Sequence, residues 1–339
     1  GFLNPGVVLA DEDTDYATDL KVAETVEEEV DRCVECGYCE PVCPSKDLTL
    51  TPRQRIVLRR EIAAAEANGD TKLAERLRQE YEYYGVDTCA VDGMCVTRCP
   101  VLINTGDLVR RLRAENQDAL GAAGWKFASK HWGAVDKVAG KALTVAKMLP
   151  FPVVRGATDI GRKLFGDDMV PAYKKGLSAG GAPRVPHTEA NPDIVFFPAC
   201  VNAMFGGVDG EGKHDPVNAT QAFIRLCERA GVKYRVPEGI DQMCCGTPWK
   251  SKGYTDGYSI MSDRVLKALW QATDGGRIPI VCDASSCTEG LEVMRAKVAA
   301  ALEHKITQGL GAGEADYAQL KLIDSVQFAA DTLLPKLTV

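Results

Sequence analysis

The chain has 339 residues, of which 45% are hydrophobic and 26% are charged, and its formal net charge is −7. This composition is ordinary for a globular protein and leaves room for two or three domains. No apolar run approaches the roughly 18 residues that a membrane-spanning helix needs. Nothing in the chain combines a net basic domain with interleaved aromatic residues, so nucleic acid is not an expected partner.

Thirteen cysteines stand in two dense groups. An odd number of cysteines with tight C-x2-C spacing does not resemble the disulfide framework of a secreted protein. The spacing instead favours metal binding in a reducing compartment. We therefore expect a cytoplasmic protein.

Residues 1–31 carry ten acidic residues against one basic residue, Lys21. Few apolar side chains follow the opening "GFLNPGVVL". This pattern predicts an exposed acidic linker.

Residues 32–116 hold the first cysteine group and three predicted helices. The first helix begins with Thr51 as N-cap and Pro52 at the first helical position, and it ends at Asn68-Gly69. A third helix begins near Asp107. The helix between them has an apolar face that comprises Leu73, Leu77, Tyr81 and Tyr84. We expect these faces to pack around whatever the cysteines hold.

The first cysteine group consists of two related stretches, "CVECGYCEPVCP" at 33–44 and "CAVDGMCVTRCP" at 89–100. In bacterial iron–sulfur proteins, three cysteines spaced C-x2-C-x2-C bind one cluster, and a fourth, three residues later and followed by proline, binds the other cluster. The first predicted [4Fe–4S] site therefore comprises Cys33, Cys36, Cys39 and Cys99. The second comprises Cys43, Cys89 and Cys95, with Asp92 where a cysteine would normally stand.

Asp92 has two functional interpretations, and both stay open. Its carboxylate binds a fourth iron, or it stands beside the open corner of a [3Fe–4S] cluster. Asp92-Gly93 is also ordinary turn chemistry, which is compatible with either. Zinc could use four of these thiolates, but two copies of the C-x3-C-P ending favour iron–sulfur clusters.

Residues 117–187 form a basic segment followed by a Gly/Pro linker, "SAGGAPRVP" at 178–186. From 117 to 165 there are eight Lys or Arg and three Asp. The segment predicts a basic amphipathic helix, which either packs on its own protein, docks a partner or lies on an anionic membrane surface. Peripheral membrane contact is therefore one expectation. Its apolar face comprises Trp125, Trp132, Val135, Ala139, Ala142 and Leu149, opposite Lys126, Lys130, Lys137 and Lys141.

Residues 188–339 alternate between strand and helix patterns, which predicts an α/β domain with a parallel sheet. The predicted strands are 193–198, 233–238, 278–283 and 320–325, and the predicted helices are 218–231, 254–272 and 286–302. Ligands of such sheets gather at the carboxyl ends of the strands. Five cysteines follow strand ends and are expected to meet there: Cys200, Cys244, Cys245, Cys282 and Cys287.

Cys227 and the histidines are not expected to belong to a metal site. Cys227 lies on a helix face with Phe223, Leu226 and Ala230, and we expect a buried structural thiol. The four histidines are isolated from the motifs and are treated as ordinary side chains.

The cysteine stretches resemble known families. Because roughly thirty helical residues separate the first two motifs, the first group resembles the α-helical ferredoxin domain of succinate dehydrogenase-type subunits. "PACVNAMFG", "CCGTPWKSKG" and "DASSC" resemble the CCG domain of heterodisulfide reductase-type and glycolate oxidase-type iron–sulfur subunits. This resemblance implies a site at Cys200, Cys244, Cys245 and Cys287. The family's usual C-x2-C ending has Ala284 at its first position here, and Cys282 is a possible substitute.

Together the motifs resemble the C-terminal part of FAD- and iron–sulfur-containing D-lactate dehydrogenases. The resemblance implies an upstream FAD domain and a second CCG repeat downstream. The opening "FLNPGVVL" is similar to the closing strand of the substrate region of that flavin domain. The resemblance also implies electron relay from FAD, reduced by a D-2-hydroxy acid, through the clusters to a quinone or another carrier. A heterodisulfide reductase-like thiol or quinone reductase, or a zinc-stabilised docking module, is the alternative. The expected fold is α+β and multi-domain.

Overall fold

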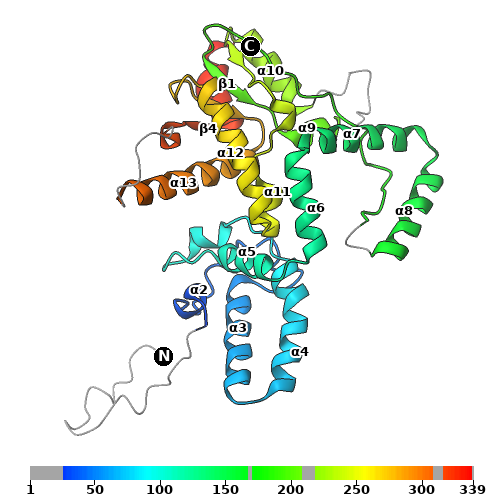
Figure 1. Cartoon of the computed structure of the whole chain (residues 1–339), viewed down its shortest axis with the longest axis vertical. Coiled ribbons are helices and arrows are strands. Elements are labelled where there is room, and N and C mark those ends of the chain that lie inside the picture. The colour runs from blue at the N-terminus through cyan, green and yellow to red at the C-terminus, as the bar shows by residue number, and fades with distance from the viewer. Residues whose placement is uncertain (1–25, 167–169, 208–217, 308–315, 338–339) are drawn as a thin grey trace. The chain divides into compact units, whose positions relative to one another are not determined.

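The computed structural model describes residues 26–166, 170–207, 218–307 and 316–337. The chain divides into two compact units, Gly1–Asn116 and Gln117–Val339. Most of the predicted acidic linker, residues 1–25, lies outside the described residues. The first unit is helical and the second contains a four-stranded parallel sheet (Figure 1), so the predicted α+β multi-domain fold is confirmed.

The helices of the first unit begin at side chains that cap them. Thr51 accepts a hydrogen bond from the Gln54 amide, and the Gln54 side chain accepts one from the Thr51 amide, which completes a capping box. Asp70 and Asn104 cap the next two long helices. The elements are α2 (Glu28–Asp31), α3 (Pro52–Ala67), α4 (Thr71–Tyr81), a π-helix (Glu82–Asp87), a 3-10 helix (Met94–Arg98) and α5 (Thr105–Glu115).

The expected apolar face of 71–84 is only partly correct. Tyr81 is 4% exposed, but Leu73 and Tyr84 are 36% and 49% exposed. The chain leaves α-helical geometry at Glu82 and continues as a π-helix, whose wider turn moves Tyr84 off the face that Tyr81 shares with the core. The core of this unit instead includes Val30, Ile56, Ile62, Tyr81, Leu108 and Val109.

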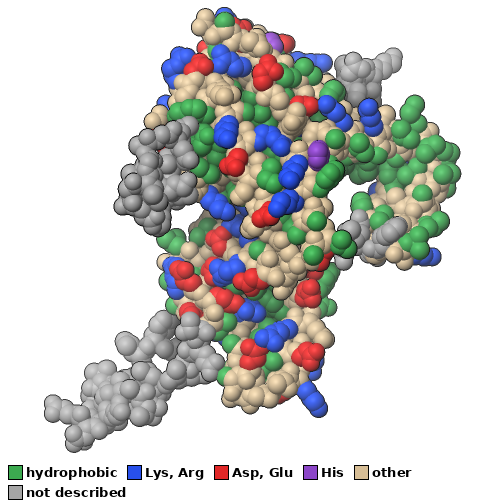
Figure 2. Space-filling model, viewed as in Figure 1, with side chains coloured by type: hydrophobic (Ala, Val, Ile, Leu, Met, Phe, Trp, Pro, Cys, Tyr) green, Lys and Arg blue, Asp and Glu red, His purple; other side chains and the backbone are tan. Residues whose placement is uncertain are grey.

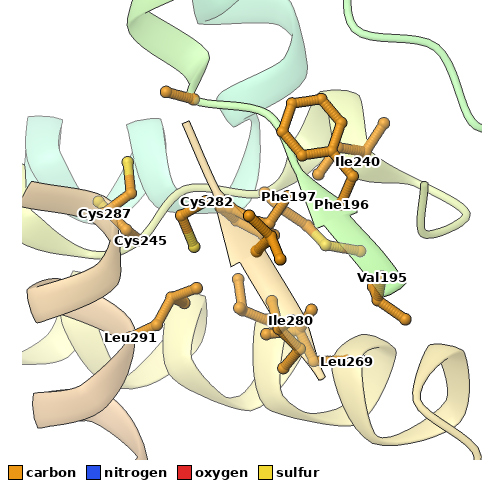
Figure 3. Packing of buried hydrophobic residues seen from close by; sticks show 14 of the residues in the cluster. Val195, Phe196, Phe197, Ile240, Cys245, Leu269, Ile280, Cys282, Cys287 and Leu291 are labelled. Atoms are coloured by element: carbon orange, nitrogen blue, oxygen red, sulfur yellow. The ribbon is translucent and has the colours of Figure 1, made fainter. Parts of the chain in front are cut away.

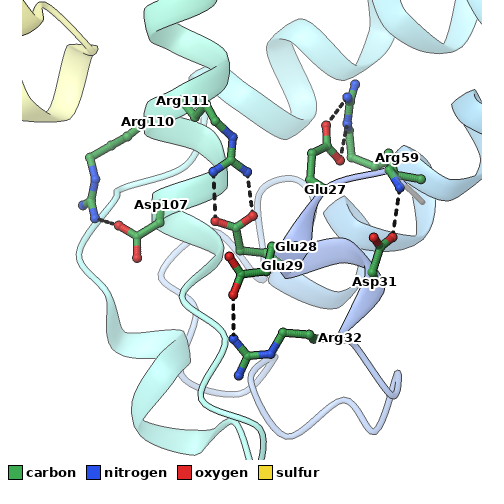
Figure 4. A network of polar contacts seen from close by, with 10 residues as sticks. Glu27, Glu28, Glu29, Asp31, Arg32, Arg59, Asp107, Arg110 and Arg111 are labelled. Carbon is green, nitrogen blue, oxygen red and sulfur yellow. Dashed lines mark hydrogen bonds and ion pairs between the residues drawn. The ribbon is translucent and has the colours of Figure 1, made fainter.

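Ion pairs hold α2 and the residue before it against the longer helices (Figure 4). Arg59 of α3 pairs with Glu27, and Arg111 of α5 pairs with Glu29. Pairs of this kind each contribute roughly 0–1 kcal/mol where they are exposed. Their role here is to fix the segment that leads directly into Cys33.

The second unit is built on a parallel sheet with strand order β2-β1-β3-β4. Val195 of β1 pairs with Arg235 of β2 and Ile280 of β3, and Val281 of β3 pairs with Ile323 of β4. The predicted strands are all present, although each is shorter than its sequence pattern. Their bounds are β1 (Ile194–Phe197), β2 (Tyr234–Arg235), β3 (Ile280–Cys282) and β4 (Leu322–Asp324).

The three predicted helices are present as α10 (Ala219–Arg229), α12 (Thr255–Ala272) and α13 (Ser285–Thr307). Three shorter helices were not predicted: α9 (Cys200–Met204), α11 (Thr247–Lys252) and α14 (Ser325–Phe328). All four residues of β1 are buried. Figure 3 shows Phe197 and Ile280 of the strands beside Leu269 of α12 and Leu291 of α13, and these side chains belong to one hydrophobic core.

The basic segment folds as three helices and belongs to the second unit. These are α6 (Ala119–Lys130), α7 (Trp132–Met148) and α8 (Phe151–Phe165). Trp132 is 5% exposed, and its ring and that of Trp125 lie 4.8 Å and 5.9 Å from the Trp249 ring. The tryptophan part of the predicted apolar face therefore packs on its own unit.

Large apolar side chains on α7 and α8 remain at the surface (Figure 2). Among the described residues of α8, none is buried. Within the part of the chain that the structure describes, no helix is both long and apolar enough to cross a bilayer.

The expected linker 178–186 packs closely into the second unit. Gly180 lies against Gly140 of α7, where an added Cβ would come within 2.2 Å of the Gly140 carbonyl oxygen. Arg184 is 7% exposed. The Gly/Pro composition here serves close backbone approach instead of a free tether, which corrects that interpretation.

Candidate metal centres

The first cavity is lined by four cysteines from both motif stretches. It has a volume of ≈ 370 Å³, part of it open to solvent, and its lining includes Cys33, Cys36, Cys39 and Cys99. The chain turns sharply between the first three, because Glu35 and Gly37 adopt φ values of 56° and 81°. The Glu35 amide donates to Cys33 Sγ at 3.4 Å. The structure thus brings together the four residues predicted for the first site.

Burial raises the pKa of two thiols in this cavity. The pKa of Cys33 is raised, and the pKa of Cys39 is raised to about 11. Arg60 holds the preceding backbone by donating to the carbonyl oxygens of Val30 and Cys33. Thiolates at such positions need a compensating positive charge, which a bound metal supplies while the thiols release their protons.

The second cavity gathers the other predicted set. It has a volume of ≈ 300 Å³, part of it open to solvent, and its lining includes Cys43, Cys89, Cys95 and Asp92. Val91 and Gly93 on either side of Asp92 adopt φ values of 55° and 73°. The Asp92 carboxylate accepts a hydrogen bond from the Met94 amide at 3.2 Å. Asp92 therefore closes a turn and lines the cavity at the same time.

Arg55 is a buried cation beside this second cavity that sequence reasoning missed. It is 1% exposed, its Nε donates to the Gly85 carbonyl oxygen at 2.6 Å, and its Nη1 lies 3.8 Å from Cys43 Sγ. Its Nη2 has no hydrogen-bond partner among the described residues. A buried cation with a spare donor fits a negatively charged, thiolate-bound group in the cavity. The sequence did carry one signal for this role: Arg55 stands seven residues before Ile62, which places both side chains on the same buried face of α3.

Residues 29–103 match the family model of the 4Fe-4S dicluster domain. The first unit carries a 4Fe-4S dicluster domain. The matched range contains both motif stretches and every cysteine that lines the two cavities, and it gives the first unit an iron–sulfur electron-transfer role. Beyond this match, no curated protein and no solved structure matches the chain.

Outside the dicluster domain, four thiols of the second group meet at the carboxyl edge of the sheet. Cys200 begins α9 directly after β1, and its Sγ lies 3.7 Å from Cys244 Sγ. Cys245 is hydrogen-bonded to Cys244 on one side and to Cys287 of α13 on the other. Figure 3 shows Cys245 and Cys287 side by side. All thirteen cysteines are free of disulfides.

Glycines allow this approach. Gly246 adopts φ 82°, and an added Cβ would come within 2.8 Å of the Tyr258 ring. At Gly290 an added Cβ would lie 2.8 Å from the Cys245 carbonyl oxygen. The glycine of the CCG stretch therefore serves the turn, and the glycine of α13 lets Cys287 reach Cys245.

The thiols of this group divide into two kinds. Hydrogen bonding to Cys244 lowers the pKa of Cys200, and hydrogen bonds to Cys244 and Cys287 hold the pKa of Cys245 well below its usual range. The pKa values of Cys244 and Cys287 are raised, because they share these hydrogen bonds with Cys200 and Cys245 and are buried. Thiols with a lowered pKa thus stand next to thiols with a raised pKa, which is the arrangement of a thiol-exchange site.

Cys282 and Cys227 lie outside this hydrogen-bonded set. Cys282 ends β3, fully buried, and burial raises its pKa. Cys227 lies in the core beside Phe223, and burial raises its pKa to about 12, as expected for a structural thiol. Among the described residues, no group of three or more His, Cys, Asp or Glu is arranged to hold a single metal ion.

Two further charged residues that sequence reasoning missed hold the loops of the second group. Asp283 accepts hydrogen bonds from the Ala199 amide and from Asn202, which fixes the loop that carries Cys200. Arg184 donates to the carbonyl oxygens of Pro198 and Met243, directly before the two cysteine loops, and pairs with buried Asp136 at 3.2 Å. Asp136 Oδ1 and Arg184 Nε have no partner among the described residues.

Proposed function

We propose that the chain is the electron-transfer module of a flavin-dependent D-2-hydroxyacid dehydrogenase, with D-lactate as the expected substrate. Its electrons would come from FAD in a separate flavin domain and leave to a quinone or another respiratory carrier. The dicluster domain supports the relay. The resemblance of the combined cysteine motifs to FAD- and iron–sulfur-containing D-lactate dehydrogenases supports the donor.

The single observation that carries the relay is the crossed lining of the two cavities. Cys99 of the second stretch lies with the first three cysteines, and Cys43 of the first stretch lies with Cys89 and Cys95. Each motif thus contributes to both sites, which ties the two sites into one short electron path. Bound [4Fe–4S] clusters supply one-electron redox centres. The chain's own residues bind them, keep water away and set the surrounding charge.

The thiol group of the second unit is proposed to hold a third centre, iron–sulfur or zinc, in addition to the two clusters of the relay. Four of its cysteines are joined by hydrogen bonds or short Sγ contacts and are buried, which suits a closed metal site with thiolate ligands. Cys282 would be an additional ligand only after its side chain joined the set.

A second candidate is a heterodisulfide reductase-like activity in which these thiols react. The lowered pKa of Cys245, beside the protonated Cys244 and Cys287, favours it, because a thiolate is the attacking group in disulfide exchange. Its 4% exposure weighs against direct attack on a bulky disulfide. Anaerobic turnover of a small disulfide by the chain with a chemical electron donor supports this candidate, and no turnover removes it.

Metal analysis of the anaerobically purified chain distinguishes a third redox centre from a zinc-stabilised docking module. Iron in excess of two clusters supports a third redox centre. Zinc in place of the third centre supports a zinc-stabilised docking module.

The donor is tested by deleting the gene in the organism that encodes it. D-lactate-dependent reduction of a quinone analogue by cell extract should be lost. Reduction driven by L-lactate or succinate serves as the control and should persist. Unchanged D-lactate-dependent reduction contradicts the proposed donor while leaving the iron–sulfur relay intact.

A further inference from the structure

A shallow groove between α7 and α8 is lined by apolar side chains from both helices. Val138 and Val145 come from α7, Val153 and Val154 come from α8, and Lys141 is the charged residue at the rim. The two helices belong to the same unit, so the groove is formed within it. Figure 2 shows hydrophobic side chains exposed over α8.

The exposed side chains follow the helical repeat. On each helix they recur at spacings of four, three and four residues, which places them on one face. Several of them are far more exposed than a core face would be: Val138 at 66%, Val145 at 56%, Ile160 at 60% and Leu164 at 71%. Contiguous apolar surface of this kind marks an interaction site. The stripes are Val138, Ala142 and Val145 on α7 with Leu149 at its C-cap, and Val153, Ala157, Ile160 and Leu164 on α8.

The charge around the groove is strongly basic. Residues 137–165 contain six Lys or Arg and one Asp, whereas the whole chain has a net charge of −7. The single acidic residue, Asp159, already pairs with Arg155. On α8 the arginines lie opposite the apolar stripe, where Arg155 and Arg162 donate to the carbonyl oxygens of Tyr173 and Val170. Lys163 is exposed beside the stripe.

We propose that the α7–α8 face docks on an anionic lipid surface. The apolar stripes enter the boundary between headgroups and acyl chains, and Lys141 and Lys163 face the lipid phosphates. A second copy of the chain fits this face poorly, because it would bring two patches of net charge +5 together. The acidic remainder of the chain is repelled by the same lipids, so the face also sets the orientation. The proposal does not depend on the identity of the electron donor.

Vesicle flotation of the full chain tests the proposal. Binding is expected to vesicles of phosphatidylcholine with phosphatidylglycerol and to be much weaker to phosphatidylcholine alone. Raising the salt to about 1 M should weaken it, because the Debye length falls to about 3 Å. The double variant Val145→Asp/Ile160→Asp should lower the partition coefficient by about tenfold or more.

Val326→Asp is the matched control. Val326 lies on α14 and is 74% exposed, so this variant adds one aspartate charge, where the double variant adds two, at a comparably open apolar site far along the chain. It should bind like the parent. Circular dichroism and iron content establish that all variants are folded and loaded.

Three results of the flotation assay overturn the proposal. The parent fails to bind anionic vesicles, or the double variant binds as well as the parent, or Val326→Asp loses as much binding as the double variant. Sedimentation velocity adds a further check. A dimer that dissociates in the double variant would assign the face to self-association and refute lipid docking.

Discussion

Replacing Arg55 with glutamine should lower the reduction potential of the second cluster by roughly 90 mV. The Arg55 guanidinium is buried, with Nη1 3.8 Å from Cys43 Sγ. At an effective dielectric constant of about 20, a positive charge at about 4 Å stabilises an added electron by about 4 kcal/mol. Because the electron is shared over a whole cluster, we expect roughly half of this, about 2 kcal/mol. About 1.4 kcal/mol corresponds to about 59 mV for one electron.

The assay is a redox titration of the anaerobically reconstituted chain, followed by EPR. The first cluster serves as an internal reference, since the Arg53 guanidinium in its cavity wall is already paired with Glu40 at 2.9 Å. Arg55→Lys is the matched variant, because it keeps the charge and loses the planar guanidinium. Its potential should stay within about 30 mV of the parent.

Iron content decides how the result is interpreted. If Arg55→Gln retains full iron and its second-cluster potential is unchanged within about 20 mV, the electrostatic reasoning is refuted, and Arg55 acts through its bond to the Gly85 carbonyl oxygen. If Arg55→Lys shifts the potential as far as Arg55→Gln does, the charge is not the cause.

Three other predictions concern the cysteines and Asp92. Cys99→Ser should deplete the first cluster and Cys43→Ser the second, as seen by EPR and iron per chain, and loss of the same cluster in both contradicts the crossed lining. Asp92→Ala should give an oxidised three-iron signal that added iron does not remove; a stoichiometric signal of this kind in the parent excludes Asp92 as a ligand. After chelation, iodoacetamide at about pH 8 should label exposed Cys36 at least about 100-fold faster than Cys227, whose pKa burial raises to about 12, and equal rates by mass spectrometry refute this.

The sequence predicted elements well where local chemistry decides them. Thr51 and Pro52 specify the start of α3 by capping and by a fixed φ, and both act within one turn. The apolar runs that form β1 and β3 are too short and too β-branched for a helix, and a parallel sheet with both faces covered needs such runs. Cysteine spacing likewise predicted that Cys99 lies with the cysteines of the first stretch. The rule that the last cysteine of each motif binds the other cluster reflects the geometry of the clusters and not the fold around them.

The buried charges could not be predicted, because their partners are distant in sequence. Arg184 reaches Asp136, 48 residues earlier, and Met243, 59 residues later. Asp283 meets the Ala199 amide 84 residues before it. No periodic pattern encodes such contacts. The same reason explains why residues 178–186 were wrongly interpreted as a linker. The close packing of Gly180 on Gly140 depends on the tertiary arrangement of α7, which the local sequence does not show.

The two cysteine groups differ in the charge that surrounds them, and this difference bears on what each can hold. Beside the second cavity the buried charge of Arg55 has no carboxylate partner among the described hydrogen bonds, so the site favours a group with net negative charge. Beside the second group, Arg184 is paired with Asp136, and the pair is close to neutral. Thiolates there must be balanced by a metal or by protons. Removing the metal of the proposed third centre should therefore reprotonate and loosen the cysteines of the second unit, whereas Arg55 would retain part of the thiolate charge around the second cavity.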